Sequence, residues 1–185
     1  MIDEFLQDAR EHMDKSVEST RLKFQSVRTG RASPALLDRI NVDYYGAVTP
    51  LKQLSTISAP EARMLTVQPF DKSSIKAIER AIMESDLGLT PNNDGTLIRL
   101  VLPELTEERR KQLVKVVRGL TEEGKVALRN IRRDVMHDLK ELRDAGEAGA
   151  DDEHRAEEAL QKLTDDKVKE LDALLKGKEA EILEV

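Results

Sequence analysis

Residues 105–143 limit most strongly what this chain can fold into. Apolar residues recur there every three or four positions, the spacing that gathers side chains on one face of an α-helix. These positions are Leu113, Val117, Leu120, Ala127, Leu128, Ile131, Val135, Leu139 and Leu142. The stretch contains no proline. It therefore predicts one helix of about 40 residues, roughly 60 Å long, which must bury its apolar face against other long helices.

A second face of the same helix is basic. Taking 100° per residue, several cations fall within about 40° of Arg118, namely Lys111, Lys125, Arg129, Arg132, Lys140 and Arg143. Residues 105–143 carry eleven Lys or Arg against seven Asp or Glu, a balance of +4, in a chain whose total is -6, so the remainder carries -10.

This basic stripe has two interpretations. Clustered cations on an acidic protein suit a polyanion that docks on one face, whereas charged helical surfaces are also common as solvated faces. Spacing alone does not separate the two. Arginine at positions 118, 129, 132 and 133 favours nucleic acid, because a guanidinium pairs with phosphate at two points and stacks on bases.

Composition narrows the functional class further. The chain has no cysteine, which excludes disulfides and thiolate chemistry and fits a reducing compartment. No apolar run approaches the roughly 20 residues that span a bilayer, and the N-terminus shows no signal-peptide pattern. We therefore expect a cytoplasmic protein that does not enter the membrane.

Two further segments repeat the helical spacing. Residues 2–27 keep it, with Thr20 standing in for one apolar position, and predict a first helix. Residues 146–151 break the pattern, and a third helix is expected to begin near Asp152. Three helices with one apolar seam each can bury those seams only against one another, so the sequence predicts an elongated antiparallel three-helix bundle.

The central segment follows different rules. All six prolines lie between Pro34 and Pro103, which excludes a continuous long helix there. Residues 40–44, 64–67 and 97–102 alternate as strands, residues 91–95 form a polar turn, and Ser73 or Ser74 caps a short helix that ends before Gly88. We expect a small β/α/β domain, so the fold class is α+β.

The predicted boundaries follow from these patterns. Residues 1–29 and 105–185 form the bundle, and residues 31–104 form the inserted domain between helices one and two. Two connections cross between the domains, and we expect a hinge there because few residues can be buried at such a junction. The hinge residues are Thr29, Gly30, Arg31, Pro103, Glu104 and Leu105.

Two short motifs could suggest nucleotide or metal binding, and both are better explained by helix structure. Residues 119–125 satisfy G-x-x-x-x-G-K, but Val126 replaces the Ser or Thr that would hold magnesium, and no strand precedes the motif. The acidic run 151–153 before His154 is better explained by helix capping than by metal binding. We expect no enzyme activity, no cofactor and no metal.

One aromatic run has two interpretations. Tyr44, Tyr45 and Gly46 fit core packing followed by a turn glycine, and this interpretation is favoured. The alternative places one ring outward from a strand, for stacking or for contact with a partner.

Several blocks in order resemble the ribosome recycling factor family of bacterial type, over essentially the full chain. They are RTGRASP (28–34), YYG (44–46), SDLGL (85–89), LTEERRK (105–111) and VALRNIRRD (126–134). The resemblance implies an L-shaped molecule with transfer-RNA-like dimensions: a three-helix bundle and a β/α/β domain joined by a flexible elbow.

The resemblance also implies a function. Such a protein binds the post-termination ribosome and, with elongation factor G and its GTP hydrolysis, splits it into subunits and releases mRNA and tRNA. Basic residues of the bundle contact large-subunit ribosomal RNA, and these correspond to Arg110, Arg129, Arg132 and Arg133, with Arg31 at the elbow. Arg118 and Lys125 are added from the helical geometry. We expect a monomer.

An alternative hypothesis, from another functional class, is that the chain is a helical adaptor or chaperone-like binding protein. That hypothesis predicts an exposed apolar groove along the bundle and indifference to RNA. The ribosome hypothesis predicts attachment that depends on arginine and weakens with salt.

Overall fold

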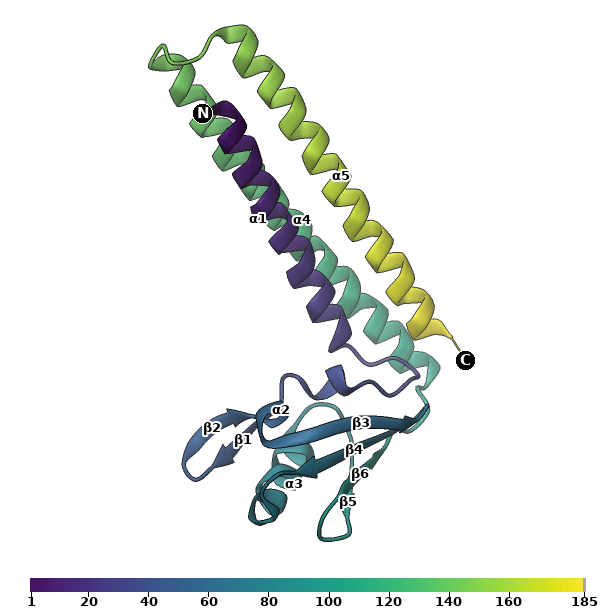
Figure 1. Ribbon diagram of the computed structural model, residues 1–185. Coiled ribbons are helices and arrows are strands. Elements are labelled where there is room, and N and C mark those ends of the chain that lie inside the picture. The colour runs from purple at the N-terminus through teal and green to yellow at the C-terminus, as the bar shows by residue number, and fades with distance from the viewer. Residues whose placement is uncertain (185) are drawn as a thin grey trace. The chain divides into compact units, whose positions relative to one another are not determined.

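The computed structural model describes residues 1–184, which form two compact units (Figure 1). Unit 1 contains residues 1–24 and 115–179, and unit 2 contains residues 25–114 with the residues from 180 onward. The predicted α+β class, with a helical bundle and a small sheet domain, is confirmed. No helix among the described residues has the length and apolar character needed to cross a membrane.

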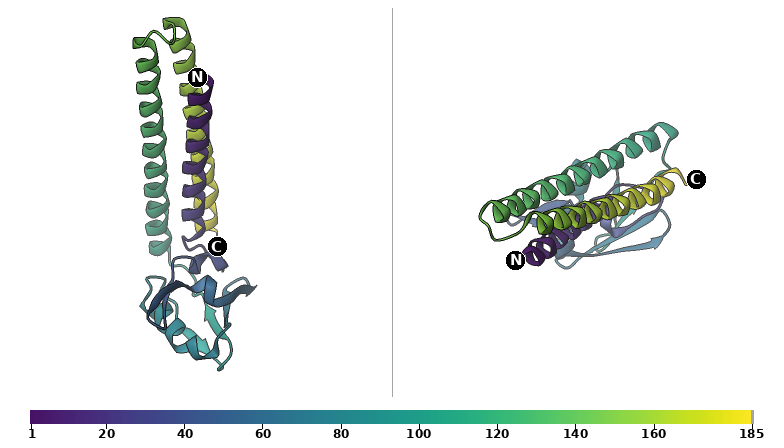
Figure 2. Two further views of the ribbon diagram at one scale, coloured as in Figure 1. Left: turned by 60° about the vertical axis from the view of Figure 1, so that its left-hand side comes forward. Right: turned by 90° about the horizontal axis from the view of Figure 1, so that it is seen from above.

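Unit 1 is built from three long helices that lie side by side in every view (Figures 1 and 2). These are α1 (Ile2–Gln25), α4 (Glu107–Asp144) and α5 (Ala150–Leu183), and the last two begin or end in unit 2. Thr106 caps α4, because its Oγ1 accepts the Arg109 backbone N–H at 3.1 Å. The helix boundaries differ from prediction by about two residues, within the usual uncertainty of helix ends.

The three apolar seams meet in one core. Its fully or nearly buried members come from all three helices: Ala9, Met13, Leu128, Val135, Leu139, Ala156, Leu160, Leu163 and Leu171. Thr20 fills the missing seam position in α1, as predicted, and is 4% exposed. Its hydroxyl is satisfied by the Ser16 carbonyl at 3.3 Å, so the polar group is buried with a partner.

Two glycines of α4 have opposite surroundings. A Cβ atom on Gly124 would lie 2.7 Å from Thr20 Oγ1 and 3.1 Å from Leu171 Cδ1, so α1, α4 and α5 approach closely at this point. A Cβ atom on Gly119 would meet nothing within 4 Å. Close packing therefore explains Gly124 and leaves Gly119 unexplained by the fold.

Unit 2 holds two antiparallel sheets (Figure 1). Strands β1 (Asn41–Tyr44) and β2 (Ala47–Pro50) form a hairpin. The second sheet has the order β3-β4-β6-β5, with β3 (Ser55–Glu61), β4 (Met64–Pro69), β5 (Pro91–Asn93) and β6 (Ile98–Val101). The helical pieces are η1 (Pro34–Leu37), α2 (Leu51–Leu54), η2 (Lys72–Ser74) and α3 (Ile75–Glu84).

The core of unit 2 lies between the second sheet and α3. Alternate residues of β4 and β6 are buried, and they cluster with the apolar side of α3. The buried residues that make this contact are Leu65, Val67, Ile75, Ile78, Ile82, Ile98 and Leu100. This one-sided alternation is the pattern that predicted the strands at 64–67 and 97–102.

The structure corrects two sequence predictions in unit 2 and adds two strands. The side-chain cap at the start of the helical segment is Asp71, whose carboxylate accepts the Ser73 N–H at 2.9 Å, and the Ser74 side chain makes no capping hydrogen bond to α3. Pro91 lies in edge strand β5 instead of a turn, because a proline is tolerated where no ladder N–H is needed. Strands β2 and β3 were not predicted, since two of the four β2 residues and five of the seven β3 residues are exposed, and both strands are defined by pairing with β1 and β4.

We predict that Gly124→Ala lowers the free energy of unfolding by about 1–3 kcal/mol, because Thr20 and Leu171 are buried and cannot move away cheaply. The matched variant is Gly119→Ala, which gains helix propensity in open space and should stabilise the protein by up to about 1 kcal/mol. Urea unfolding of the two variants beside the native chain measures both. Equal effects of the two substitutions would contradict the close approach at Gly124.

Candidate nucleic-acid interface

The predicted RNA-contacting residues of unit 1 all lie on α4. The structure separates them into two rows, according to whether the cation is directed at α5 or at solvent. Arg110 and Arg31 belong to unit 2 and are described on their own.

The first row faces α5, and we call it the paired row. Arg118 Nε lies 2.7 Å from Glu179 Oε1, Lys125 Nζ lies 2.8 Å from Asp172 Oδ1, and Arg143 Nη1 lies 2.8 Å from Glu153 Oε2. Arg132 Nη1 donates to Gln161 Oε1 at 3.1 Å. Partner numbers in α5 fall as those in α4 rise, so the contacts form a ladder between antiparallel helices. Charged pairs beside the apolar seam of a coiled coil have the same arrangement.

The paired row is engaged within the chain. Only 20% of the Lys125 side chain is exposed, and the hydrogen bond with Asp172 raises the pKa of its ammonium. The carboxylate of Glu153 is 8% exposed and is compensated by Arg143. The helical geometry that placed Arg118 and Lys125 on one ridge did not reveal that α5 supplies carboxylates to both. Their role in RNA binding stays a prediction.

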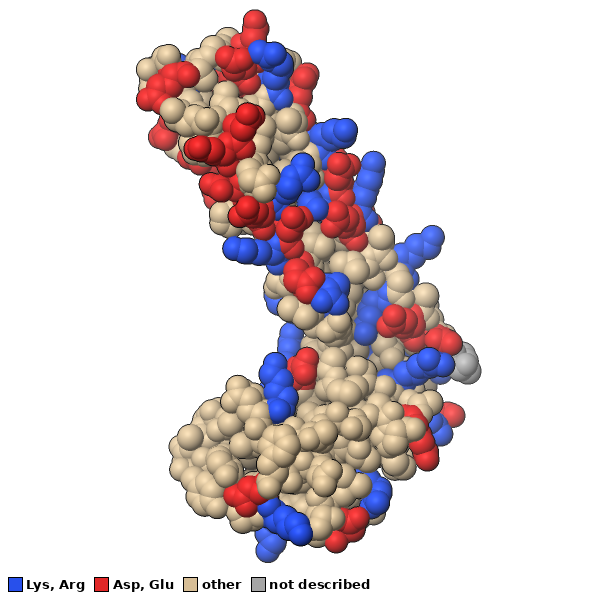
Figure 3. All heavy atoms as spheres, in the orientation of Figure 1, with Lys and Arg blue, Asp and Glu red and all other residues tan. Residues whose placement is uncertain are grey.

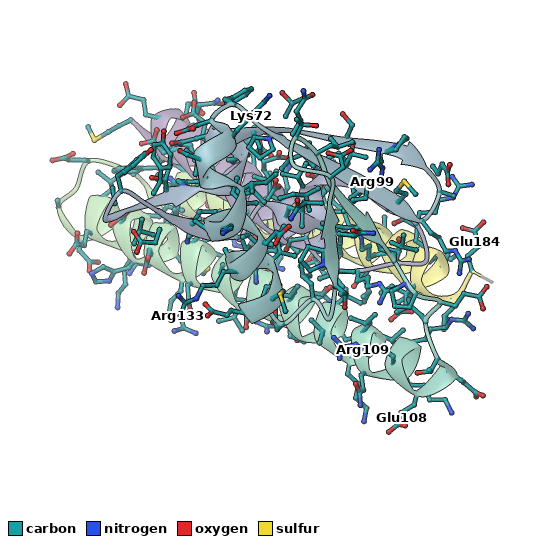
Figure 4. The ribbon with its side chains drawn as sticks, turned by 90° about the horizontal axis from the view of Figure 1, so that it is seen from below. Lys72, Arg99, Glu108, Arg109, Arg133 and Glu184 are labelled. Atoms are coloured by element: carbon teal, nitrogen blue, oxygen red, sulfur yellow. The ribbon has the colours of Figure 1, made fainter. Side chains whose placement is uncertain are left out.

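The second row, which we call the outer row, consists of Arg129, Arg133 and Lys140. All three side chains are exposed. Within residues 1–184, none of them makes an ion pair or a side-chain hydrogen bond. Arg133 projects away from the ribbon in Figure 4. An unpaired guanidinium in solvent keeps all its donors available, so this row can bind phosphate without breaking an internal contact.

Arg132 is the member of the paired row whose α5 partner is uncharged. It is half-buried, and besides Gln161 its Nη1 contacts the Met136 sulfur at 3.7 Å. Met136 itself packs against the bundle core. Met136, which lies between the basic positions Arg132 and Lys140, is therefore a packing residue that also contacts Arg132.

Two predicted cations lie in unit 2. Arg31 is exposed, and its backbone N–H donates to Thr29 Oγ1 at 3.2 Å in a local turn. Arg110, in the first turns of α4, is half-buried, and its Nε atom is buried without a hydrogen-bond partner. A buried guanidinium N–H without a hydrogen-bond partner costs the fold stability.

The sequence reasoning did not single out Arg28 or Arg109. The Arg28 guanidinium donates to the Pro103 carbonyl. It thereby joins the segment near residue 28 to the segment near residue 103, both of which belong to unit 2. Burial, followed by the charge of Arg109, lowers the pKa of Arg28. Both residues stand inside blocks that carry the family resemblance, but nothing in their spacing indicates that a side chain near residue 28 reaches residue 103.

We predict different stability effects in the two rows. Lys125→Gln should lower the free energy of unfolding by about 0.5–1 kcal/mol, whereas Arg129→Gln should leave it unchanged, because only Lys125 has internal partners. The Lys125 pKa is raised above its ordinary 10.5, so its contribution is complete below that pH and disappears as pH rises past the folded-state value. Urea unfolding of both variants at pH 7 and pH 11 checks this. An equal loss in the two variants at pH 7 would contradict the division into rows.

Fold and surface together define a class of protein: a helical bundle with a small sheet domain and an exposed row of unpaired cations suited to phosphate. Within residues 1–184, no group of three or more His, Cys, Asp or Glu side chains is placed to hold a metal ion. The histidines of the bundle instead make helix contacts, such as His137 with Glu141.

Comparison with known proteins narrows this class to one family. Residues 20–183 match the family model of the ribosome recycling factor. The chain is 55% identical over 180 residues to the ribosome-recycling factor of Rubrobacter xylanophilus, covering 97% of each chain. It is 56% identical over 185 residues to that of Halalkalibacterium halodurans, covering 100% of both.

Solved structures that align with this chain are also of ribosome recycling factors. A solution structure of the ribosome recycling factor aligns over 100% of this chain and 98% of its own, with a TM-score of 0.76 and 42% identity. The Thermus thermophilus ribosome recycling factor, in a model with Escherichia coli elongation factor G bound to the E. coli post-termination complex, aligns over 100% of both chains with a TM-score of 0.68 and 47% identity. The chain belongs to the ribosome recycling factor family, whose members are translation factors without catalytic activity.

Proposed function

We propose that this protein binds the post-termination ribosome in the cytoplasm as a monomer. Together with elongation factor G and its GTP hydrolysis, it splits the ribosome into subunits and releases mRNA and tRNA. Family membership supports the recycling role, and a relative that is 47% identical has been placed with elongation factor G on a post-termination complex. Within this chain, the proposal rests on the outer row of α4.

The outer row supplies the attachment to large-subunit ribosomal RNA. Arg129 and Arg133 are four residues apart on one exposed helix face and have no internal partner in the described part of the chain. Each can therefore bind a phosphate without losing a contact of the folded protein. Arg132, Arg110 and Arg31 add cations beside this row or in unit 2. Arg118 and Lys125 contribute only if phosphate competes with Glu179 and Asp172.

The paired row gives the bundle the stiffness that such a mechanism needs. Contacts at Arg118, Lys125 and Arg143 tie α4 to α5 at intervals along their length, on top of the apolar seam. A bundle held in this way can transmit a force from one end to the other instead of bending. We propose that elongation factor G pushes on the inserted domain and that the anchored bundle drives the subunits apart.

The motion is proposed to occur at the hinge predicted from the sequence, Thr29–Arg31 and Pro103–Leu105, between a bundle of residues 1–29 and 105–185 and a domain of residues 31–104. The secondary structure supports this proposal, because residues 28–33 and 102–106 have no helix or strand. The contact from Arg28 to the Pro103 carbonyl joins these connections inside unit 2. These predicted hinge residues all fall within unit 2.

Ribosome attachment is tested by co-sedimentation with vacant ribosomes and with isolated large subunits over a salt series. We predict that Arg129→Gln with Arg133→Gln weakens binding and lowers the slope of log affinity against log salt by about 1 for each phosphate contact removed. The matched control is Lys162→Gln with Lys169→Gln, which removes the same charge from exposed positions of α5.

The control variant should bind like the native chain, except for a small uniform loss from the change in net charge. Equal weakening in both double variants would mean that charge alone, and not the outer row, mediates binding. A native chain that fails to sediment with ribosomes at low salt would contradict the proposed function and favour the adaptor hypothesis.

A further inference from the structure

Three of the four contacts in the paired row join a cation to a carboxylate, and the fourth does not. The carboxylates are those of Glu179, Asp172 and Glu153. At the remaining position Arg132 Nη1 donates to Gln161 Oε1 at 3.1 Å, and Arg132 makes no ion pair within residues 1–184. On the face of unit 1 that Figure 3 shows, blue Lys and Arg side chains lie among red Asp and Glu side chains. A cation held by a neutral amide is therefore the exception in this row.

The amide of Gln161 is itself fixed by a second residue of α5. Gln161 Nε2 donates to Asp165 Oδ1 at 2.9 Å, one helical turn farther along the chain. An arginine can only donate and a carboxylate can only accept, so just one orientation of the amide satisfies both neighbours. That orientation directs Gln161 Oε1 at Arg132. Asp165 therefore orients the group that receives the guanidinium, without pairing with the guanidinium itself.

The contacts of Arg132 leave one edge of its guanidinium open. Both of them, to Gln161 Oε1 and to the Met136 sulfur at 3.7 Å, are made by Nη1. Within residues 1–184, Nε and Nη2 make no hydrogen bond, and together they form a fork that can bind a phosphate at two points. Arg118 is the opposite case, because its Nε already donates to Glu179.

Arg132 combines an ordered side chain with an uncompensated charge. Arg129 and Arg133 keep their charge, but they are exposed without a partner and must be ordered when they bind. Arg118 and Lys125 are held in place, but carboxylates compensate them. Arg132 is half-buried and held by a neutral group, so part of its side-chain entropy is lost before any phosphate arrives. Such a cation binds a phosphate at a lower cost than either of the other kinds.

We propose that Gln161 is a positioning residue for RNA binding. With Asp165 behind it, Gln161 holds the Arg132 guanidinium in the orientation that receives a ribosomal RNA phosphate, and its neutral amide leaves the Arg132 charge uncompensated. This inference rests on the proposed function and adds residues of α5 that act through α4. A carboxylate of the same size at this position would pair with Arg132 and hold the two helices at least as well. The neutral side chain is thus explained by binding and not by folding.

Gln161→Glu separates these two explanations, since it adds a carboxylate without changing the size of the side chain. We expect the variant to be at least as stable as the native chain in urea unfolding. In co-sedimentation with isolated large subunits, its affinity should fall about fivefold and the slope of log affinity against log salt should be lower by about 1. The matched control is Ala159→Glu, which adds the same charge at an exposed position about 200° round α5 and should stay within about twofold of native.

Arg132→Gln shows whether Gln161 acts through Arg132. In that background Gln161→Glu should weaken binding no more than Ala159→Glu does, because the guanidinium to be neutralised is gone. An equal loss in both backgrounds would overturn the inference, since Gln161 would then act on the RNA directly. Equal affinities of Gln161→Glu and Ala159→Glu in the otherwise native chain would also overturn it, and would leave the proposed function standing.

Asp165 gives a second test, in which the expected change is opposite to the effect of net charge. Asp165→Ala and Asp166→Ala each remove one exposed carboxylate, and only Asp165 orients Gln161. Loss of a negative charge by itself favours a polyanion, yet Asp165→Ala should bind large subunits about threefold or more weakly than Asp166→Ala, because the amide and the guanidinium lose their fixed orientation. Equal or tighter binding by Asp165→Ala contradicts the inference alone. A native chain that fails to bind large subunits at low salt contradicts the proposed function and the inference with it.

Discussion

Burial of the apolar seam of α4 against α1 and α5 is the constraint on which the rest of unit 1 depends. At Gly124 the helices approach so closely that Thr20 and Leu171 occupy the space of a missing Cβ atom. This contact fixes the rotation of α4 about its axis. Because a helix is rigid, every other side chain of α4 is then assigned to the core, to the border with α5 or to solvent.

The rotation of α4 gives identical residue types different functions. Arg118 and Lys125 lie at the border and pair with carboxylates of α5, while Arg129 and Arg133 lie slightly farther round and face solvent. The angular difference is a few tens of degrees. It separates cations that hold the bundle together from cations that are available to a phosphate, and it explains how a chain with a net charge of -6 can carry a local cationic surface suited to a polyanion.

The core of unit 2 is formed by a sheet and a helix instead of three helices. This core is satisfied by aliphatic side chains from the second sheet and α3, so the aromatic residues are not needed there. Tyr45 occupies a turn that another residue would stabilise better, and Asp71, which begins the next helical segment, also orders its ring. The sequence favoured core packing for residues 44–46, which is wrong for Tyr45 because this residue is 80% exposed.

The sequence by itself determined the fold class, the three long helices, the buried seams down to Thr20, and the strands with clean alternation, because periodicity directly encodes which side of an element is buried. Block-by-block resemblance also indicated the family. Only the tertiary structure decided which basic residues are paired, that Met136 packs, that Arg28 reaches Pro103, and that Tyr45 faces solvent. Each of those facts depends on a neighbour distant in the chain, and a helical wheel or a turn motif contains no information about that neighbour.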